Sequence, residues 1–199
     1  MTLAVSDISF EYEHRKEILH HVSLEVNSEE IVTLSGPSGK GKTTLLHCIA
    51  GLLTPTSGKI IVGGVDVTAM KPHERDIGIM MQNQPLYEHL SVEQNIAFPL
   101  RTRGSKRNVS SLLEQLELHA IAKQKVSKCS GGERRRVAFG WAVVIEPIVL
   151  LLDEPFISLN EELRDILLEN IQRLRVSTLI VTHEHDKTVS DRVLTLEEL

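Results

Sequence analysis

The sequence predicts an α/β fold in which helices cover a mostly parallel β-sheet. Three observations support this prediction. Strand-like aliphatic runs alternate with helical periodicity through the second half of the chain, a glycine-rich turn joins one such run to a helix, and another run ends in two carboxylates. The middle segment, about residues 86–145, lacks strong strand signals. We therefore expect residues 1–199 to form a single domain with a helical insertion subdomain at about 86–145.

The composition indicates an ordinary globular chain. Hydrophobic residues make up 41% and charged residues 25%, which excludes disorder, collagen-like repeats and a disulfide-rich miniprotein. Acidic residues (27) outnumber basic residues (22), so a generally basic nucleic-acid binder is not indicated. The longest aliphatic run, Ile148–Leu152, is far shorter than the roughly 20 residues of a membrane-spanning helix. The two cysteines lack metal-ligand spacing and are expected to be reduced thiols of a cytosolic protein.

The elements follow in order along the chain. Apolar side chains alternate along residues 8–12 and 22–26, which predicts two strands joined by a polar hairpin turn at residues 13–17. Further strands are expected at Ile31–Leu34, Lys59–Val62, Ile77–Met81, Ile148–Leu152, Thr178–Thr182 and Val193–Leu196. Helices are expected at about Thr43–Leu53, Val109–Leu116, Glu133–Val144 and Glu161–Leu174.

The strongest motif is a phosphate-binding loop between a strand and a helix, Gly36-Pro37-Ser38-Gly39-Lys40-Gly41-Lys42-Thr43. The glycines let successive backbone N–H groups point at phosphate oxygens, and the following helix adds the positive end of its dipole. Lys42 is expected to contact the β- and γ-phosphates, and the Thr43 hydroxyl to bind Mg²⁺. Thr44 is expected to complete this nucleotide site.

Two carboxylates, Asp153 and Glu154, follow the aliphatic run Ile148–Leu152. A parallel sheet presents a site where its strands end, so Asp153 is expected to hold Mg²⁺ through its water shell. Glu154 is expected to polarise the water that attacks the γ-phosphate. Taken alone, such a pair also fits a solvated strand end.

A second anion-binding surface is indicated at Ser130-Gly131-Gly132. Ser130 is a good N-cap and Glu133 stands three residues later, as in a capping box. A capping box alone is the simpler interpretation. The glycines, however, leave helix-start amides uncovered, which suits a phosphate.

In this order, the motifs GPSGKGKT, CSGGERRRVA, LLLDEP and VTHE resemble those of the nucleotide-binding subunits of ABC transporters, of the importer type. The resemblance covers nearly the whole chain. It implies a P-loop NTPase (RecA-like), mostly parallel core with an N-terminal antiparallel β subdomain and a helical insertion subdomain. It also implies that the ligands are ATP and Mg²⁺.

The same resemblance implies further roles. Tyr12 matches the aromatic residue that stacks on adenine, although a tyrosine in the core would look the same. Gln82 matches the glutamine that touches Mg²⁺ and the attacking water, and His183 matches the histidine near the γ-phosphate. Ser130-Gly131-Gly132 matches the signature that contacts the nucleotide of a second protomer, so a head-to-tail homodimer or pseudo-dimer is implied.

The implied partner is an integral membrane permease, with this chain peripheral on the cytoplasmic face of the membrane. The segment 85–100 resembles the stretch that docks the permease in importers of small solutes or ions. Its apolar residues would alternatively be core of the helical insertion. No nucleic-acid partner is expected.

Several residues depart from the family pattern. Cys129 and Glu133 stand where the signature has leucine and glutamine, and Asn160 stands where aspartate is usual. Trp141 replaces a common arginine, and Lys40 adds a charge inside the phosphate loop. The residues assigned to chemistry are intact, so a competent ATPase is expected.

Three other functions are weighed against this interpretation. An exporter or lipoprotein-release subunit would carry the same motifs. A soluble ABC ATPase without a transporter generally has paired cassettes, coiled-coil insertions or zinc modules, which this sequence lacks. A monomeric P-loop kinase or GTPase would give Ser130-Gly131-Gly132 no role.

Overall fold

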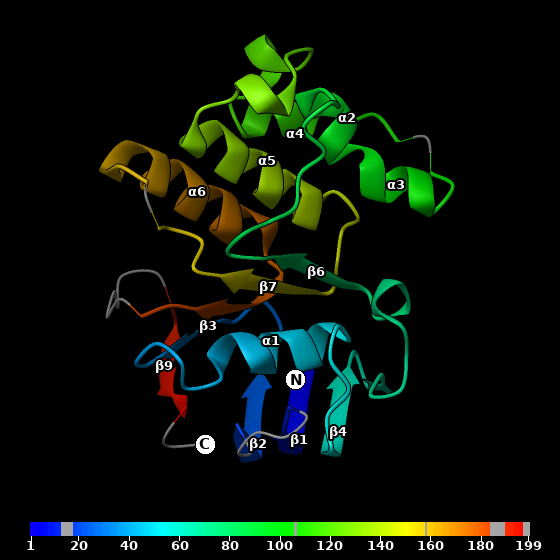
Figure 1. Ribbon diagram of the computed structural model, residues 1–199, viewed down its shortest axis with the longest axis vertical. Coiled ribbons are helices and arrows are strands. Elements are labelled where there is room, and N and C mark those ends of the chain that lie inside the picture. The colour runs from blue at the N-terminus through cyan, green and yellow to red at the C-terminus, as the bar shows by residue number, and fades with distance from the viewer. Residues whose placement is uncertain (13–17, 106, 158, 184–189, 197–199) are drawn as a thin grey trace. The chain divides into compact units, whose positions relative to one another are not determined.

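The computed structural model describes residues 1–12, 18–105, 107–157, 159–183 and 190–196. The chain divides into two compact units (Figure 1). One comprises residues 1–79, 148–154 and 175–199, and the other comprises residues 80–147 and 155–174. The predicted hairpin turn at 13–17 lies outside the described residues.

An antiparallel sheet opens the first unit. It contains β1 (Leu3–Phe10), β2 (Leu19–Val26), β4 (Ser57–Val62) and β5 (Val65–Asp66), in the order β2-β1-β4-β5. Val5 of the central β1 pairs with Leu24 on one side and Ile60 on the other. Burial alternates along β2 from Val22 to Val26, so this part of the strand turns one face to the core and the other to solvent, as the period-two pattern predicts.

The second sheet has the order β6-β7-β8-β3-β9. Its strands are β3 (Ile31–Ser35), β6 (Ile77–Met80), β7 (Val149–Asp153), β8 (Ser177–Val181) and β9 (Arg192–Thr195). The pairs β7–β8, β8–β3 and β3–β9 are parallel. Every residue of β3, β7 and β8 is buried, as expected for a sheet covered on both faces, and the α/β prediction is confirmed.

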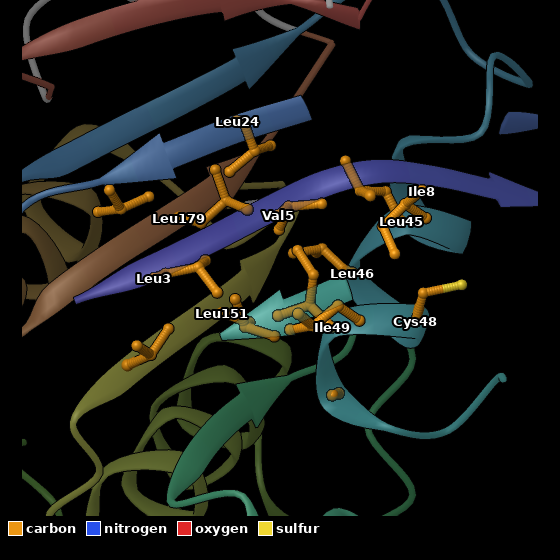
Figure 2. Packing of buried hydrophobic residues seen from close by; sticks show 14 of the residues in the cluster. Leu3, Val5, Ile8, Leu24, Leu45, Leu46, Cys48, Ile49, Leu151 and Leu179 are labelled. Atoms are coloured by element: carbon orange, nitrogen blue, oxygen red, sulfur yellow. The ribbon is translucent and has the colours of Figure 1, made fainter. Parts of the chain in front are cut away.

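Helix α1 (Lys42–Ala50) belongs to the same hydrophobic core as both sheets. The side chains of Leu46 and Ile49 lie among those of β1 and β7 (Figure 2). The expected continuation of this helix to Leu53 is wrong, because Gly51 takes a left-handed conformation (φ 79°) and ends the helix after Ala50.

The helices of the insertion lie in the second unit (Figure 1). They are α2 (Val92–Ile96), α3 (Phe98–Thr102), α4 (Ser110–Gln115) and α5 (Gly131–Val143). The same unit also contains α6 (Glu161–Leu174), which follows β7 in the chain. Short 3₁₀ turns are η1 (Pro72–Glu74) in the first unit, and η2 (His119–Ile121) and η3 (Val126–Lys128) in the second. Among the described residues, no helix is both long enough and apolar enough to cross a membrane.

Candidate functional site

Three neighbouring strands of the parallel sheet deliver polar residues to one edge. The adjacent strands β7, β8 and β3 run parallel, so their carboxyl ends meet there. Residues 36–41 follow β3, Asp153 ends β7 and precedes Glu154, and Thr182 and His183 follow β8. All of these residues belong to the first unit. Such an edge is where open α/β sheets bind ligands.

The backbone of the phosphate loop depends on its glycines. Gly39 and Gly41 have φ values of 81° and 98°, a region that favours glycine. A Cβ on Gly41 would also lie 2.9 Å from Cγ2 of Ile18. Gly41 is the N-cap of α1, and in the described part of the chain no side chain caps this helix start. The first amides of α1 are therefore available to an anion.

Lys42 is buried, and its ammonium donates hydrogen bonds to the Gly36 and Pro37 carbonyls at 2.7 and 3.0 Å. The Thr43 hydroxyl donates to the Asp153 carboxylate, with distances of 3.0 and 3.2 Å to its two oxygens. Thr43 and Asp153, two of the three predicted magnesium ligands, are therefore neighbours. A hydroxyl and a carboxylate are oxygen donors of the kind Mg²⁺ prefers, so this pair fits the ion.

Glu154 has a strained backbone and a well-held side chain. Its φ is 50°, a left-handed conformation that costs a non-glycine residue about 1–3 kcal/mol. Its N–H donates to the Val181 carbonyl at 2.8 Å. One carboxylate oxygen accepts a bond from the Thr182 hydroxyl at 3.2 Å, and the other lies 2.8 Å from Nδ1 of His183. The predicted base and the predicted histidine thus form a pair.

Thr182 is a site residue that the sequence analysis missed. Its position before His183 at the end of a strand, inside the motif VTHE, could have indicated it. The Glu154 side chain is 12% exposed and that of His183 is 45% exposed, so one face of the pair is accessible.

The far end of α1 is held by Arg75, which the sequence analysis also missed. Its buried guanidinium donates to the carbonyls of Cys48 and Ile49 at the end of α1, and to those of Thr68 and Met70. Burial lowers the pKa of Arg75. Burial also raises the pKa of the Cys48 thiol to about 12, against the opposing effect of the Arg75 charge.

Ser130 begins α5 in the second unit, and the capping box is confirmed. The Ser130 hydroxyl accepts a bond from the Glu133 N–H at 3.3 Å, and the Glu133 carboxylate accepts one from the Ser130 N–H at 2.7 Å. The helix begins at Gly131, two residues before the predicted start, because the serine caps it there. Gly131 and Gly132 thus occupy the first turn of α5, and anion binding at this helix start stays a prediction.

Gln82 also lies in the second unit, just after β6, and it is exposed. A polar groove of about 330 Å³ runs between the residues that follow it and the start of α5. Its walls come from Gln82 itself, from Asn83, Gln84 and Leu86, and from four residues of α5: Gly131, Arg134, Arg135 and Ala138.

An aromatic cluster lies on the same unit, made of Tyr87, Phe98 and Trp141. The Tyr87 ring centroid is 4.5 Å from that of Phe98 and 5.7 Å from that of Trp141. Tyr87 is 37% exposed, whereas Ile96 of the same segment is fully buried. The apolar residues of 85–100 therefore serve partly as core and partly as surface.

Tyr12 lies just beyond the end of β1 rather than within a strand, since β1 ends at Phe10. It is 37% exposed, and its ring meets the Phe10 ring edge-on with centroids 4.8 Å apart. The proposed adenine contact remains a prediction. Asn160, in place of the usual aspartate, accepts a hydrogen bond from the Leu163 N–H at 3.0 Å in the first turn of α6.

Comparisons with known proteins find related sequences along nearly the whole chain. The family described as ABC transporter matches residues 19–157. The sulfate/thiosulfate import ATP-binding protein CysA 1 of Agrobacterium fabrum is 41% identical over an alignment 213 residues long, which covers 100% of this chain and 61% of that protein. The sn-glycerol-3-phosphate import ATP-binding protein UgpC of Burkholderia ambifaria is 40% identical, covering 98% of this chain and 57% of that protein. The chain thus spans between 57% and 61% of the length of these two relatives.

A solved structure supports the fold. The ADP conformation of MJ1267, an ATP-binding cassette of an ABC transporter, superposes with a TM-score of 0.84 at 24% identity. The superposition covers 98% of this chain and 86% of that one.

Proposed function

Because the chain belongs to the ABC transporter family, we propose that it is an ATP-binding subunit that hydrolyses ATP to drive a separate membrane permease. The observation that carries the proposal is the grouping of phosphate-binding and catalytic residue types at one edge of the parallel sheet. The phosphate loop, the Thr43–Asp153 pair and the Glu154–His183 pair all lie at the carboxyl ends of adjacent strands.

Each group has a distinct role in the proposed reaction. The loop amides and the Lys42 ammonium bind the phosphates and offset their charge. Thr43 and Asp153 would hold Mg²⁺, which supplies charge neutralisation between the phosphates. Glu154 orients the attacking water and accepts its proton, and His183 and Thr182 fix that carboxylate by the bonds described above. Gln82 and Tyr12 are proposed to contact the metal site and the adenine.

The second unit is proposed to act on the nucleotide of a partner subunit. The start of α5 offers Gly131 and Gly132 in its first turn, beside the capping serine. A phosphate bound by two chains would hold a head-to-tail dimer together, and hydrolysis would release it. Both relatives are named as import ATP-binding proteins, so we propose that this chain drives the import of a small solute. The chain itself would lie on the cytoplasmic face of the membrane.

Substitution of Glu154 by glutamine tests the assignment. The amide keeps the shape of the side chain but cannot accept a proton, so turnover should fall by about a hundredfold or more while ATP binding persists. Size-exclusion chromatography with Mg-ATP should then show a trapped dimer. The matched control is Glu169→Gln, which alters only an exposed ion pair with Arg173 on α6. Undiminished hydrolysis in the Glu154→Gln chain contradicts the proposal.

Docking of the permease is proposed on the aromatic cluster of Tyr87, Phe98 and Trp141. The cluster combines partly exposed rings with neighbouring polar residues, a composition suited to a protein interface. A photoreactive residue at position 87 should crosslink a polytopic membrane protein in vesicles. The same probe at exposed Glu169 should not, and labelling of soluble proteins alone speaks against this surface.

A further inference from the structure

A single guanidinium on α5 joins two segments that lie far apart in the sequence. Nη1 of Arg135 donates a hydrogen bond to the Gln82 carbonyl at 2.8 Å. Nε of the same side chain donates to the Pro155 carbonyl at 3.0 Å. All three residues belong to the second unit. Arg135 itself stands in the second turn after Ser130, the residue that caps this helix.

Both acceptors are backbone atoms next to proposed site residues. Gln82 is the second residue after β6, and a bond to its carbonyl fixes the backbone that carries its side chain. Pro155 directly follows Glu154, whose backbone is held at a left-handed φ of 50°. Proline has no N–H, so its carbonyl is the one backbone group through which that residue can be hydrogen-bonded.

The chemistry of arginine suits this double contact. The guanidinium is a rigid, planar fork with several donors, so two carbonyls in different directions can be held at once. A lysine ammonium lacks that fork, and a glutamine amide is shorter and uncharged. The adjacent Arg134 has a different task, since its bonds go to the Glu88 carboxylate and the Val126 carbonyl.

We propose that Arg135 is a positioning residue for ATP hydrolysis. It holds the backbone at Gln82 and the backbone directly after Glu154 in a fixed relation to the start of α5. This inference rests on the proposed function, because it assigns Arg135 an effect only through Gln82 and Glu154. Since Arg135 acts on the geometry of the reacting groups, it should influence the rate of hydrolysis more than the binding of ATP.

The test is Arg135→Gln in the full chain. Small displacements of catalytic groups cost up to about a hundredfold in rate, so kcat should fall about ten- to a hundredfold. KM and the Kd for ATP should stay within about threefold of wild type, and the melting temperature should be nearly unchanged. Arg135→Lys should recover part of kcat. The control is Arg173→Gln, which changes an equal charge at an exposed site on α6.

Two results overturn the inference: an unchanged kcat, or parallel losses of melting temperature, ATP affinity and kcat, which indicate a structural role alone. Should Arg135→Gln not fold, the same readings are taken on Arg135→Lys. Failure of the proposed function looks different, because wild type would then not hydrolyse ATP or Glu154→Gln would remain active.

Discussion

Replacement of Arg75 by methionine should destabilise the first unit without touching the phosphate loop directly. Arg75 is 3% exposed and donates to four carbonyls, two of them at the end of α1. Methionine is apolar and of similar length, so it fills the space but donates nothing. The expected loss of stability therefore comes from backbone carbonyls left without a hydrogen-bond donor.

The magnitude follows from these four acceptors. The Cys48 carbonyl keeps a second donor, the Gly51 N–H at 3.1 Å, so this carbonyl contributes little to the loss of stability. The Ile49 carbonyl is buried and would cost about 1–3 kcal/mol when unpaired. The Thr68 and Met70 carbonyls are only part-buried and would cost about 1 kcal/mol each. Removal of a buried charge recovers part of this sum, because burial already lowers the pKa of Arg75. A net loss of about 2–4 kcal/mol is expected.

Urea unfolding followed by circular dichroism measures this loss, with the fluorescence of Trp141 reporting on the second unit. Arg173→Met is the matched control, since Arg173 is 71% exposed and its pair with Glu169 should contribute less than about 1 kcal/mol. A loss for Arg75→Met below about 1 kcal/mol, or one equal to the control, would refute the reasoning. The free energy of unfolding of a typical domain is about 5–15 kcal/mol, so a loss of this size should be readily measured.

Three further outcomes are expected. Lys42→Ala should weaken ATP binding by tenfold or more in an equilibrium binding assay, because the loop loses its buried cation; unchanged affinity would dismiss the loop assignment. Ser130→Ala should cut hydrolysis while the ATP affinity of the monomer stays intact, and an equal fall in monomer affinity would assign Ser130 to the site of its own chain. The Cys48 thiol has a pKa of about 12 against 9.0 for the free group, so its contribution to stability is complete below pH 9 and declines as the pH rises from 9 towards 12. Urea midpoints at pH 8 and 10.5 should therefore drop less in Cys48→Ala than in wild type, and an equal drop would rule out this thiol as a cause.

The fold could be predicted wherever the sequence pattern was long and local. Helix α6 begins and ends where its periodicity indicates, and strands β7 and β8 are shifted by one residue. The five-residue helices α2 and α3 were missed, because one turn and a half gives almost no periodic signal.

The site likewise contains some residues whose contacts the sequence could predict and others whose contacts it could not. Thr43 and Asp153 could be paired in advance, since parallel strands bring their ends to one edge. The partners of Arg75 and Arg135 could not be predicted, because both side chains bind backbone carbonyls. Every residue type has a backbone carbonyl, so no side-chain pattern reveals such a partner. Contacts of this kind become visible only when the chain is folded.

The position of Lys42 has a consequence for how tightly a nucleotide can bind. A free lysine side chain loses up to about 2 kcal/mol of rotamer freedom when it is immobilised. Here the two loop carbonyls immobilise the Lys42 side chain when the protein folds. This entropy is therefore lost on folding and does not oppose nucleotide binding. A polyphosphate therefore meets a cation whose side chain is already ordered, so less of the attraction between them is offset by lost side-chain entropy.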